Sequence, residues 1–139
     1  MSAESFSTPA ALQPGLEAQV EKIIPLEWTI AHYDARLPAV LSTPAMIGMM
    51  ELAAARAVQA ALPPGAITVG TRIEVDHLKA VAAGAHLVAH ARFVGMNGKI
   101  LAFEVEARSG ELLIGKGRVY RAIVEFERFA SGAGLRQSS

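Results

Sequence analysis

The sequence predicts an α+β domain in which one antiparallel sheet wraps around a single long, buried helix. Three observations support this fold class. The elements run in the order of one strand, one helix and then four strands joined by short turns. The helix is apolar on nearly every side until Arg56, as is typical of a helix that is buried all round. Each later strand alternates apolar and polar residues, so it has one apolar face with which to cover the helix.

The composition is that of one globular domain without a dominant charge. The chain has 139 residues, 52% apolar and 19% charged, with a formal net charge of zero. We therefore expect neither a nucleic-acid footprint nor a polybasic membrane patch. With no cysteine, the chain has no disulfide, thiolate zinc site or cysteine nucleophile. Residues 1–13 lack a secretory signal, and no apolar run reaches about 18 residues, so a cytoplasmic protein is expected.

Three segments are predicted along the chain. Residues 1–19 are rich in Ser, Ala and Pro and form a flexible N-terminal arm, residues 20–130 form the domain, and residues 131–139 form a disordered tail. Residues 21–32 alternate and are predicted to be the first strand. The apolar face of this strand consists of Ile24, Leu26, Trp28 and Ile30. A short loop, residues 32–42, leads to the helix.

The helix is predicted to begin at Thr43, with Thr43 as the N-cap and Pro44 as the first helical residue. It is predicted to end near Leu62, because a Pro-Pro-Gly sequence follows and cannot continue a helix.

The strand after the helix covers residues 67–77. Its expected inward face consists of Ile67, Val69, Thr71, Ile73, Val75 and His77. Its expected outward face consists of Thr68, Arg72, Glu74 and Asp76. Because side chains alternate along a strand, these two sets are predicted to lie on opposite sides of the sheet.

Three more strands follow, separated by turn signals at Gly84, Asn97-Gly98 and Ser109-Gly110. The expected inward residues are Leu87, Ala89, Ala91 and Phe93 in one strand and Leu101, Phe103, Val105 and Ala107 in the next. The last strand covers residues 112–126, where Gly115 and Gly117 predict a bulge or a close backbone approach.

This order of elements is that of the hotdog fold, a sheet curled around one central helix. A single sheet of this kind leaves its edge strands and part of the helix uncovered. We therefore expect a homodimer, or a dimer of such dimers, to cover them.

Three polar residues stand out as candidates for chemistry. Glu51 is the only charge in the apolar run 45–55, and it could pair with Arg56, face a dimer partner or act in catalysis. Thr43 lies eight residues earlier, where it could serve only as a helix cap or also help to hold negative charge at the helix start. His77 ends its strand in the inward phase, either as a satisfied core histidine or at the mouth of a cleft.

Threonine, glutamate and histidine together can carry out acyl transfer. A histidine can take a proton from water or give one to a leaving thiolate. A carboxylate can orient that histidine or attack the acyl carbon itself. A threonine hydroxyl can bind the carboxylate or the carbonyl, and backbone N–H groups at a helix start can hold the oxyanion.

The spacing of Thr43, Glu51, the Val69-Gly70-Thr71 segment and His77 resembles that of the fluoroacetyl-CoA thioesterase family of hotdog proteins. The similarity covers about residues 20–130. It continues through Gly84, the run Phe103-Glu104-Val105-Glu106-Ala107-Arg108, Ile114, Lys116-Gly117, Arg121-Ala122 and Glu127-Arg128-Phe129.

This resemblance implies that Thr43, Glu51 and His77 are catalytic. It also implies that Gly70 lines the site near the thioester and that Arg121 is a basic substrate-binding residue of the last strand. The implied activity is hydrolysis of an acyl-CoA thioester in a homodimer with sites near the subunit interface, without a metal or a bound cofactor.

Two features differ from the family's fluoroacetate-specific member. That member has a longer, Phe-rich segment before the catalytic threonine, whereas residues 32–42 here are short and hold no Phe. The family also has a histidine where this chain has Val119. We therefore expect hydrolysis of a short or medium acyl-CoA without discrimination for fluorine.

Other functions fit parts of the pattern. A non-catalytic module that binds acyl-CoA or a small ligand would share the fold, and a thioesterase could act on a carrier-protein thioester instead. A hotdog hydratase needs an Asp and a His several residues apart, whereas Asp76 and His77 are adjacent on a strand and point to opposite faces.

Overall fold

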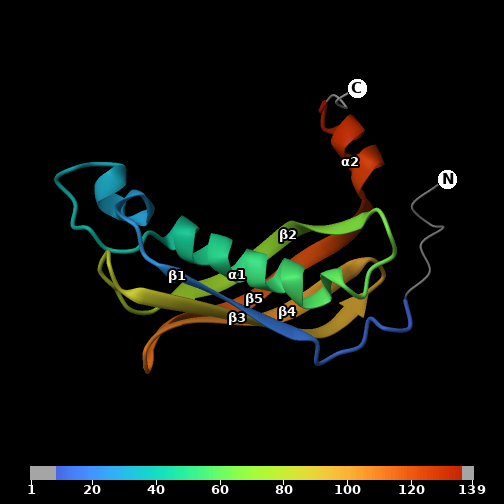
Figure 1. Ribbon diagram of the computed structural model, residues 1–139, viewed down its shortest axis with the longest axis horizontal. Coiled ribbons are helices and arrows are strands. Elements are labelled where there is room, and N and C mark those ends of the chain that lie inside the picture. The colour runs from blue at the N-terminus through green and yellow to red at the C-terminus, as the bar shows by residue number, and fades with distance from the viewer. Residues whose placement is uncertain (1–8, 136–139) are drawn as a thin grey trace.

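The computed structural model describes residues 9–135, and it confirms the predicted α+β hotdog architecture. Five antiparallel strands in the order β1-β3-β4-β5-β2 form one sheet, and the helix α1 lies across its inner face (Figure 1). The elements are β1 (Glu17–Ile23), α1 (Thr43–Gln59), β2 (Ala66–His77), β3 (His86–Asn97), β4 (Ile100–Ser109), β5 (Leu112–Glu125) and α2 (Phe126–Gly132).

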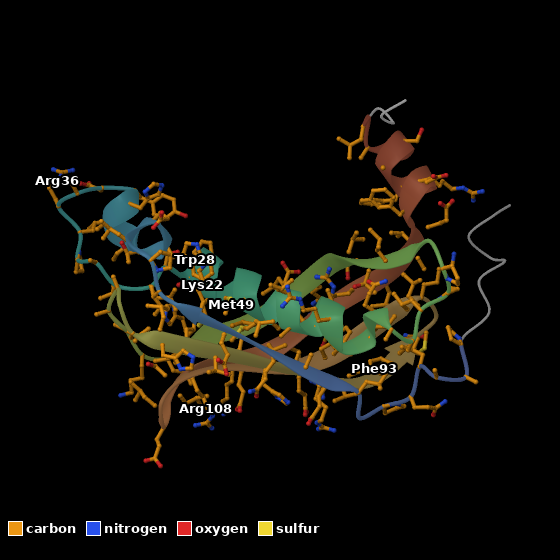
Figure 2. The ribbon with its side chains drawn as sticks, viewed as in Figure 1. Lys22, Trp28, Arg36, Met49, Phe93 and Arg108 are labelled. Atoms are coloured by element: carbon orange, nitrogen blue, oxygen red, sulfur yellow. The ribbon has the colours of Figure 1, made fainter. Side chains whose placement is uncertain are left out.

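The core lies between α1 and the inner face of the sheet. Met46 and Met50 of α1 are fully buried, and Phe93 and Phe103 meet beneath the helix with ring centroids 5.6 Å apart. The inward residues predicted for β3 and β4 are all buried. Arg108, by contrast, lies on the face of the sheet away from α1 (Figure 2). The period-2 pattern therefore predicted both faces of these two central strands correctly.

The predicted first strand at residues 21–32 is wrong in its position. The strand β1 begins at Glu17, inside the segment that was predicted to be a flexible arm. Residues Leu26–Trp28 and Ile30–His32 form two short 3-10 helices instead. Both the backbone N–H and the hydroxyl of Thr29 donate to the carbonyl of Leu26, and these local hydrogen bonds compete with extension of the strand.

The two faces predicted for the first half of β2 are also exchanged. Ala66 and Thr68 are buried, although Thr68 was expected to face outward and its neighbours Ile67 and Val69 inward. The pairing register with β5 shifts between Gly70 and Arg72. A bulge adds one residue to the strand, so the inward phase moves from even to odd positions across it.

The helix α1 is buried on one side only. Gly48 and Leu52 are exposed, and Leu52 has 41% of its surface accessible. The expectation of a helix buried all round is therefore not met within one chain. The helix ends at Gln59, before the predicted Leu62, and a turn follows. The exposed strip of the helix lies on the side where a further subunit could cover it.

The C-terminal region contains a helix that was not predicted. The strand β5 ends at Glu125, whose side chain accepts hydrogen bonds from the backbone N–H groups of Glu127 and Arg128 and so caps α2. The helix α2 projects away from the sheet (Figure 1). The outer parts of the predicted arm and tail, residues 1–8 and 136–139, lie outside the described residues.

The two glycines that the sequence singled out in β5 are sites of close approach, as predicted. A side chain at Gly117 would collide with the backbone carbonyl of Glu74, and one at Gly115 would lie 2.5 Å from Sδ of Met46. Within residues 9–135, no helix is long and apolar enough to cross a membrane.

Candidate active site

Thr43 and His77 are in direct contact at the start of α1. Oγ1 of Thr43 lies 2.7 Å from Nδ1 of His77. The prediction that Thr43 is the N-cap and Pro44 the first helical residue was wrong by one position. Ser42 is the N-cap, and its Oγ accepts a hydrogen bond from the N–H of Ala45. Because Ser42 caps the helix, the hydroxyl of Thr43 is free to bond to the histidine.

The histidine lies at the end of β2 in the inward phase, as the sequence predicted. Its Nδ1 is held by Thr43, while its Nε2 is shielded from solvent and has no hydrogen-bond partner among residues 9–135. An exposed hydroxyl bonded to an imidazole nitrogen is the arrangement of a nucleophile or proton relay with its base. The pair can therefore move a proton between the imidazole and a group that reaches Thr43.

Glu51 is paired with Arg121 and not with Arg56. Oε1 of Glu51 accepts a hydrogen bond of 3.1 Å from Nη1 of Arg121, and 32% of the glutamate side chain remains accessible. Gly70 lies directly beneath the carboxylate, since a Cβ at this position would collide with Oε1. Glu51, Gly70 and Arg121, which the sequence nominated separately, therefore form one cluster.

Arg121 is almost fully buried, with 8% of its surface exposed. Its Nε donates to Oγ1 of Thr68 and its Nη2 donates to the carbonyl of Thr68, each over 2.8 Å. Burial lowers the pKa of Arg121, and the neighbouring Glu51 carboxylate raises it and so opposes that effect. An arginine remains charged at neutral pH even so, which places a fixed positive charge beside Glu51.

Thr68 was missed because it was predicted to face outward. The isolated glycine at position 70, inside a strand pattern, was the available signal, because such a glycine often marks a bulge. Once the bulge is placed there, the pattern brings Thr68 and Gly70 to the inner face together with His77.

An open pocket of about 730 Å³ lies above Glu51. Its walls include Glu51, Leu52, Val69, Gly70, Ile73 and Arg121. Apolar walls with one carboxylate, that of Glu51, and two guanidinium groups, those of Arg72 and Arg121, suit an acyl group that carries one reactive polar centre. Within the described part of the chain, no group of three or more His, Cys, Asp or Glu side chains is placed to hold a metal ion.

The five nominated residues form two clusters within one chain. The cluster of Thr43 and His77 lies at the start of α1, and that of Glu51, Gly70 and Arg121 lies further along the helix. Eight helical residues correspond to about 12 Å along the axis, too far for Glu51 to contact the pair directly.

Comparisons with known proteins identify related thioesterases. The family model described as fluoroacetyl-CoA-specific thioesterase matches residues 26–127. The fluoroacetyl-CoA thioesterase of Streptantibioticus cattleyicolor is 33% identical over 113 residues, which cover 77% of this chain and 81% of that protein.

Solved structures are similar over nearly their whole length. A threonine-to-serine variant of the fluoroacetyl-CoA thioesterase FlK, in complex with acetyl-CoA, has a TM-score of 0.83 at 29% identity and covers 88% of this chain and 97% of its own. A thioesterase superfamily member from Thermus thermophilus has a TM-score of 0.81 at 26% identity, covering 88% and 91%.

Proposed function

This chain belongs to the fluoroacetyl-CoA-specific thioesterase family, and on that premise we propose that Thr43, Glu51 and His77 are the residues with which it hydrolyses acyl-CoA thioesters. The reaction adds water across the thioester and releases a free acid and CoA. The observation that carries the assignment is the 2.7 Å contact between Thr43 and His77, next to a helix start that can hold an oxyanion.

A homodimer is the second part of this proposal. Among the strands of residues 9–135, β2 is at an edge of the sheet, because its one partner there is β5. Ile73 on this edge and Leu52 on the neighbouring side of α1 are exposed at 38% and 41%. A long edge strand with apolar residues beside it is a surface on which a second strand can pair.

Pairing of β2 with β2 of a second copy would also unite the two clusters. Antiparallel pairing that sets Gly70 opposite His77 of the partner subunit places a two-fold axis at Glu74, since the bulge sets both Thr71 and Arg72 opposite a single residue of the other strand. Directly opposed residues of an antiparallel pair have their side chains on the same face. Glu51, which lies over Gly70, would then approach the Thr43–His77 pair of the partner subunit.

In this composite site each group has a defined task. The thioester carbonyl lies over the start of α1. His77 takes a proton from water, or gives one to the CoA sulfur, through the hydroxyl of Thr43, which bonds to its Nδ1 while its Nε2 is shielded from solvent. Glu51 acts either as the general base or as the nucleophile that forms a transient acyl-enzyme. Single turnover in heavy-oxygen water tests the covalent route, because label enters Glu51 only if water attacks the glutamyl carbonyl of an acyl-enzyme. Absence of label from Glu51, together with absence of any trapped acyl-enzyme, would count against that route.

Free-thiol release from a panel of acyl-CoAs tests the proposed function. We expect the wild-type chain to release CoA, and Glu51→Gln and His77→Ala to reduce kcat by about 100-fold or more while the fold is retained, because each removes a group that moves charge or protons. His90→Ala is the matched control, since His90 lies on the outer face, paired with Glu17. Near-normal turnover of His77→Ala would contradict the assignment.

We also propose that the enzyme does not discriminate for fluorine. The segment before Thr43 forms two short 3-10 helices and a loop that contains no Phe. We therefore expect acetyl-CoA and fluoroacetyl-CoA to have kcat/KM values within about tenfold of each other, equivalent to about 1.4 kcal/mol. A preference for the fluorinated substrate of more than about 100-fold would refute this expectation.

The same experiments decide between the remaining functions. A binding module would retain acyl-CoA without releasing thiol, and a carrier-directed enzyme would release the acyl group only from carrier protein. The cytoplasmic location expected from the sequence stays a prediction.

A further inference from the structure

We propose that Thr68 is a positioning residue of this site, which fixes the guanidinium of Arg121 so that its Nη1 meets the carboxylate of Glu51. The inference rests on the proposed function in one respect, namely that Glu51 takes part in hydrolysis. Thr68 is absent from the pocket walls, so it would act through Arg121 and not by touching the substrate.

Thr68 is the partner of two of the three nitrogens of the Arg121 guanidinium. Nε donates to Oγ1 of Thr68 and Nη2 donates to its carbonyl oxygen, both over 2.8 Å. The third nitrogen, Nη1, donates to Oε1 of Glu51 over 3.1 Å. A guanidinium is a rigid planar fork, so fixing two of its nitrogens fixes the direction of the third.

The burial of the three residues indicates that these hydrogen bonds do more than satisfy a buried charge. Thr68 and Arg121 have 5% and 8% of their surfaces exposed, whereas Glu51 is partly open to the pocket. Water can therefore solvate the glutamate but has little access to the other two residues. Gly70 provides the space in which the carboxylate meets Nη1. The two buried residues, Thr68 and Arg121, therefore set the direction from which the guanidinium meets the partly exposed carboxylate of Glu51.

The kinetic test compares two substitutions that separate shape from hydrogen bonding. Thr68→Val keeps the β-branched shape but removes the acceptor for Nε, while Thr68→Ser keeps the hydroxyl and removes a methyl group. We expect Thr68→Val to lower kcat about tenfold with KM changed by less than about twofold, and Thr68→Ser to recover most of that loss. Equal losses in both variants, or full activity of Thr68→Val, would overturn the inference.

A double-mutant cycle tests whether Thr68 acts through Arg121. Arg121→Lys keeps the charge but cannot form the fork. If the effect passes through the guanidinium, adding Thr68→Val to Arg121→Lys lowers kcat by less than about twofold more. If the double variant instead lost kcat by the product of the two single losses, Thr68 would not act through Arg121.

An NMR measurement keeps the inference testable without activity. The Nε–Hε signal of Arg121 is identified by its loss in Arg121→Lys. We expect it to shift in Thr68→Val but not in Thr29→Val, which removes the hydroxyl of another buried threonine, bonded to Leu26. A wild-type chain that hydrolyses no acyl-CoA would refute the proposed function alone, whereas an unshifted signal in Thr68→Val would refute the positioning role.

Discussion

At the scale of single residues, each functional side chain is available because a neighbour takes over a structural task. Ser42 caps α1, and this leaves the hydroxyl of Thr43 for His77. Thr68 satisfies most of the buried guanidinium of Arg121, and this leaves Nη1 for Glu51. Replacing an N-cap serine costs about 1 kcal/mol in many helices, so Ser42 also contributes to stability.

Gly70→Ala separates placement of Glu51 from stability of the fold. The backbone at Gly70 is not in a left-handed conformation, and the atoms nearest to an added Cβ belong to the flexible end of Glu51. We therefore expect Tm to change little, while the displaced carboxylate lowers kcat by at least about tenfold, because small misplacements of reacting groups are costly.

The control for this prediction is Gly132→Ala, where an added Cβ has no neighbour within 4 Å. It should leave both Tm and kcat close to wild type. If Gly70→Ala also turned over acyl-CoA at the wild-type rate, the contact between position 70 and Glu51 would have no role in catalysis.

Glu51 and His77 could be nominated as candidates from the sequence, but their contacts could not. Glu51 was evident because it is the single charge in an apolar helix, and His77 because of its phase at a strand end. Their partners could not be predicted from spacing alone, because Arg121 lies 70 positions from Glu51 and the contact depends on how β5 pairs with β2. Thr68 was missed because the predicted phase of β2 was wrong by one position before the bulge.

At the scale of secondary-structure elements, β2 determines the geometry of the site. Its bulge lets Gly70 and His77 both face α1 although they differ by an odd number of positions. A regular strand would turn one of them to the outer face. The predicted inward residues of β3 and β4 obeyed the simple alternation, so the faces of these strands were predicted correctly, whereas β2 was correct only in its second half.

The first strand shows a different limit of prediction from sequence. An alternating apolar pattern continued from Ile24 to Ile30, yet local hydrogen bonds at Thr29 turn this segment into two short helices. Of the four residues on the predicted apolar face, Ile24 is buried, Trp28 and Ile30 are half-buried, and Leu26 has 62% of its surface exposed. Alternation alone therefore did not predict which of these residues reach the core. Pro25 also removes a backbone donor just where the strand would have continued.

Ile73→Lys tests the role of β2 as a dimer edge. A lysine next to the proposed two-fold axis would bring two like charges close together across the interface and would place a charge on an apolar edge, and both effects oppose pairing. We expect light scattering to give the mass of a dimer for the wild-type chain and of a single chain for the variant.

Ile100→Lys is the matched control, because Ile100 is a strand residue with nearly the same exposure, 37% against 38%. It should leave the mass of the assembly unchanged. A wild-type chain that is monomeric at working concentrations, or an Ile73→Lys variant with the mass of a dimer, would contradict an interface through β2.

At the scale of the whole molecule, one chain holds two separate clusters, which in our proposal are the two halves of one site. Thr43 and His77 are at one position along α1, and Glu51 with Arg121 is about 12 Å further along it. A two-fold axis beside Ile73 would pair each half with the complementary half of the other chain. Such a dimer would also cover the strip of α1 that is exposed in the single chain although the sequence indicated a helix buried all round.

Mixing two inactive variants tests this composite site most directly. In a heterodimer of His77→Ala with Glu51→Gln, one site carries both substitutions and the other carries neither. If half of the dimers are mixed and each has one intact site, we expect thiol release from acyl-CoA to recover to about a quarter of the wild-type rate, whereas each variant alone stays inactive. No recovery, although mass spectrometry shows that heterodimers have formed, would contradict a site shared between two chains.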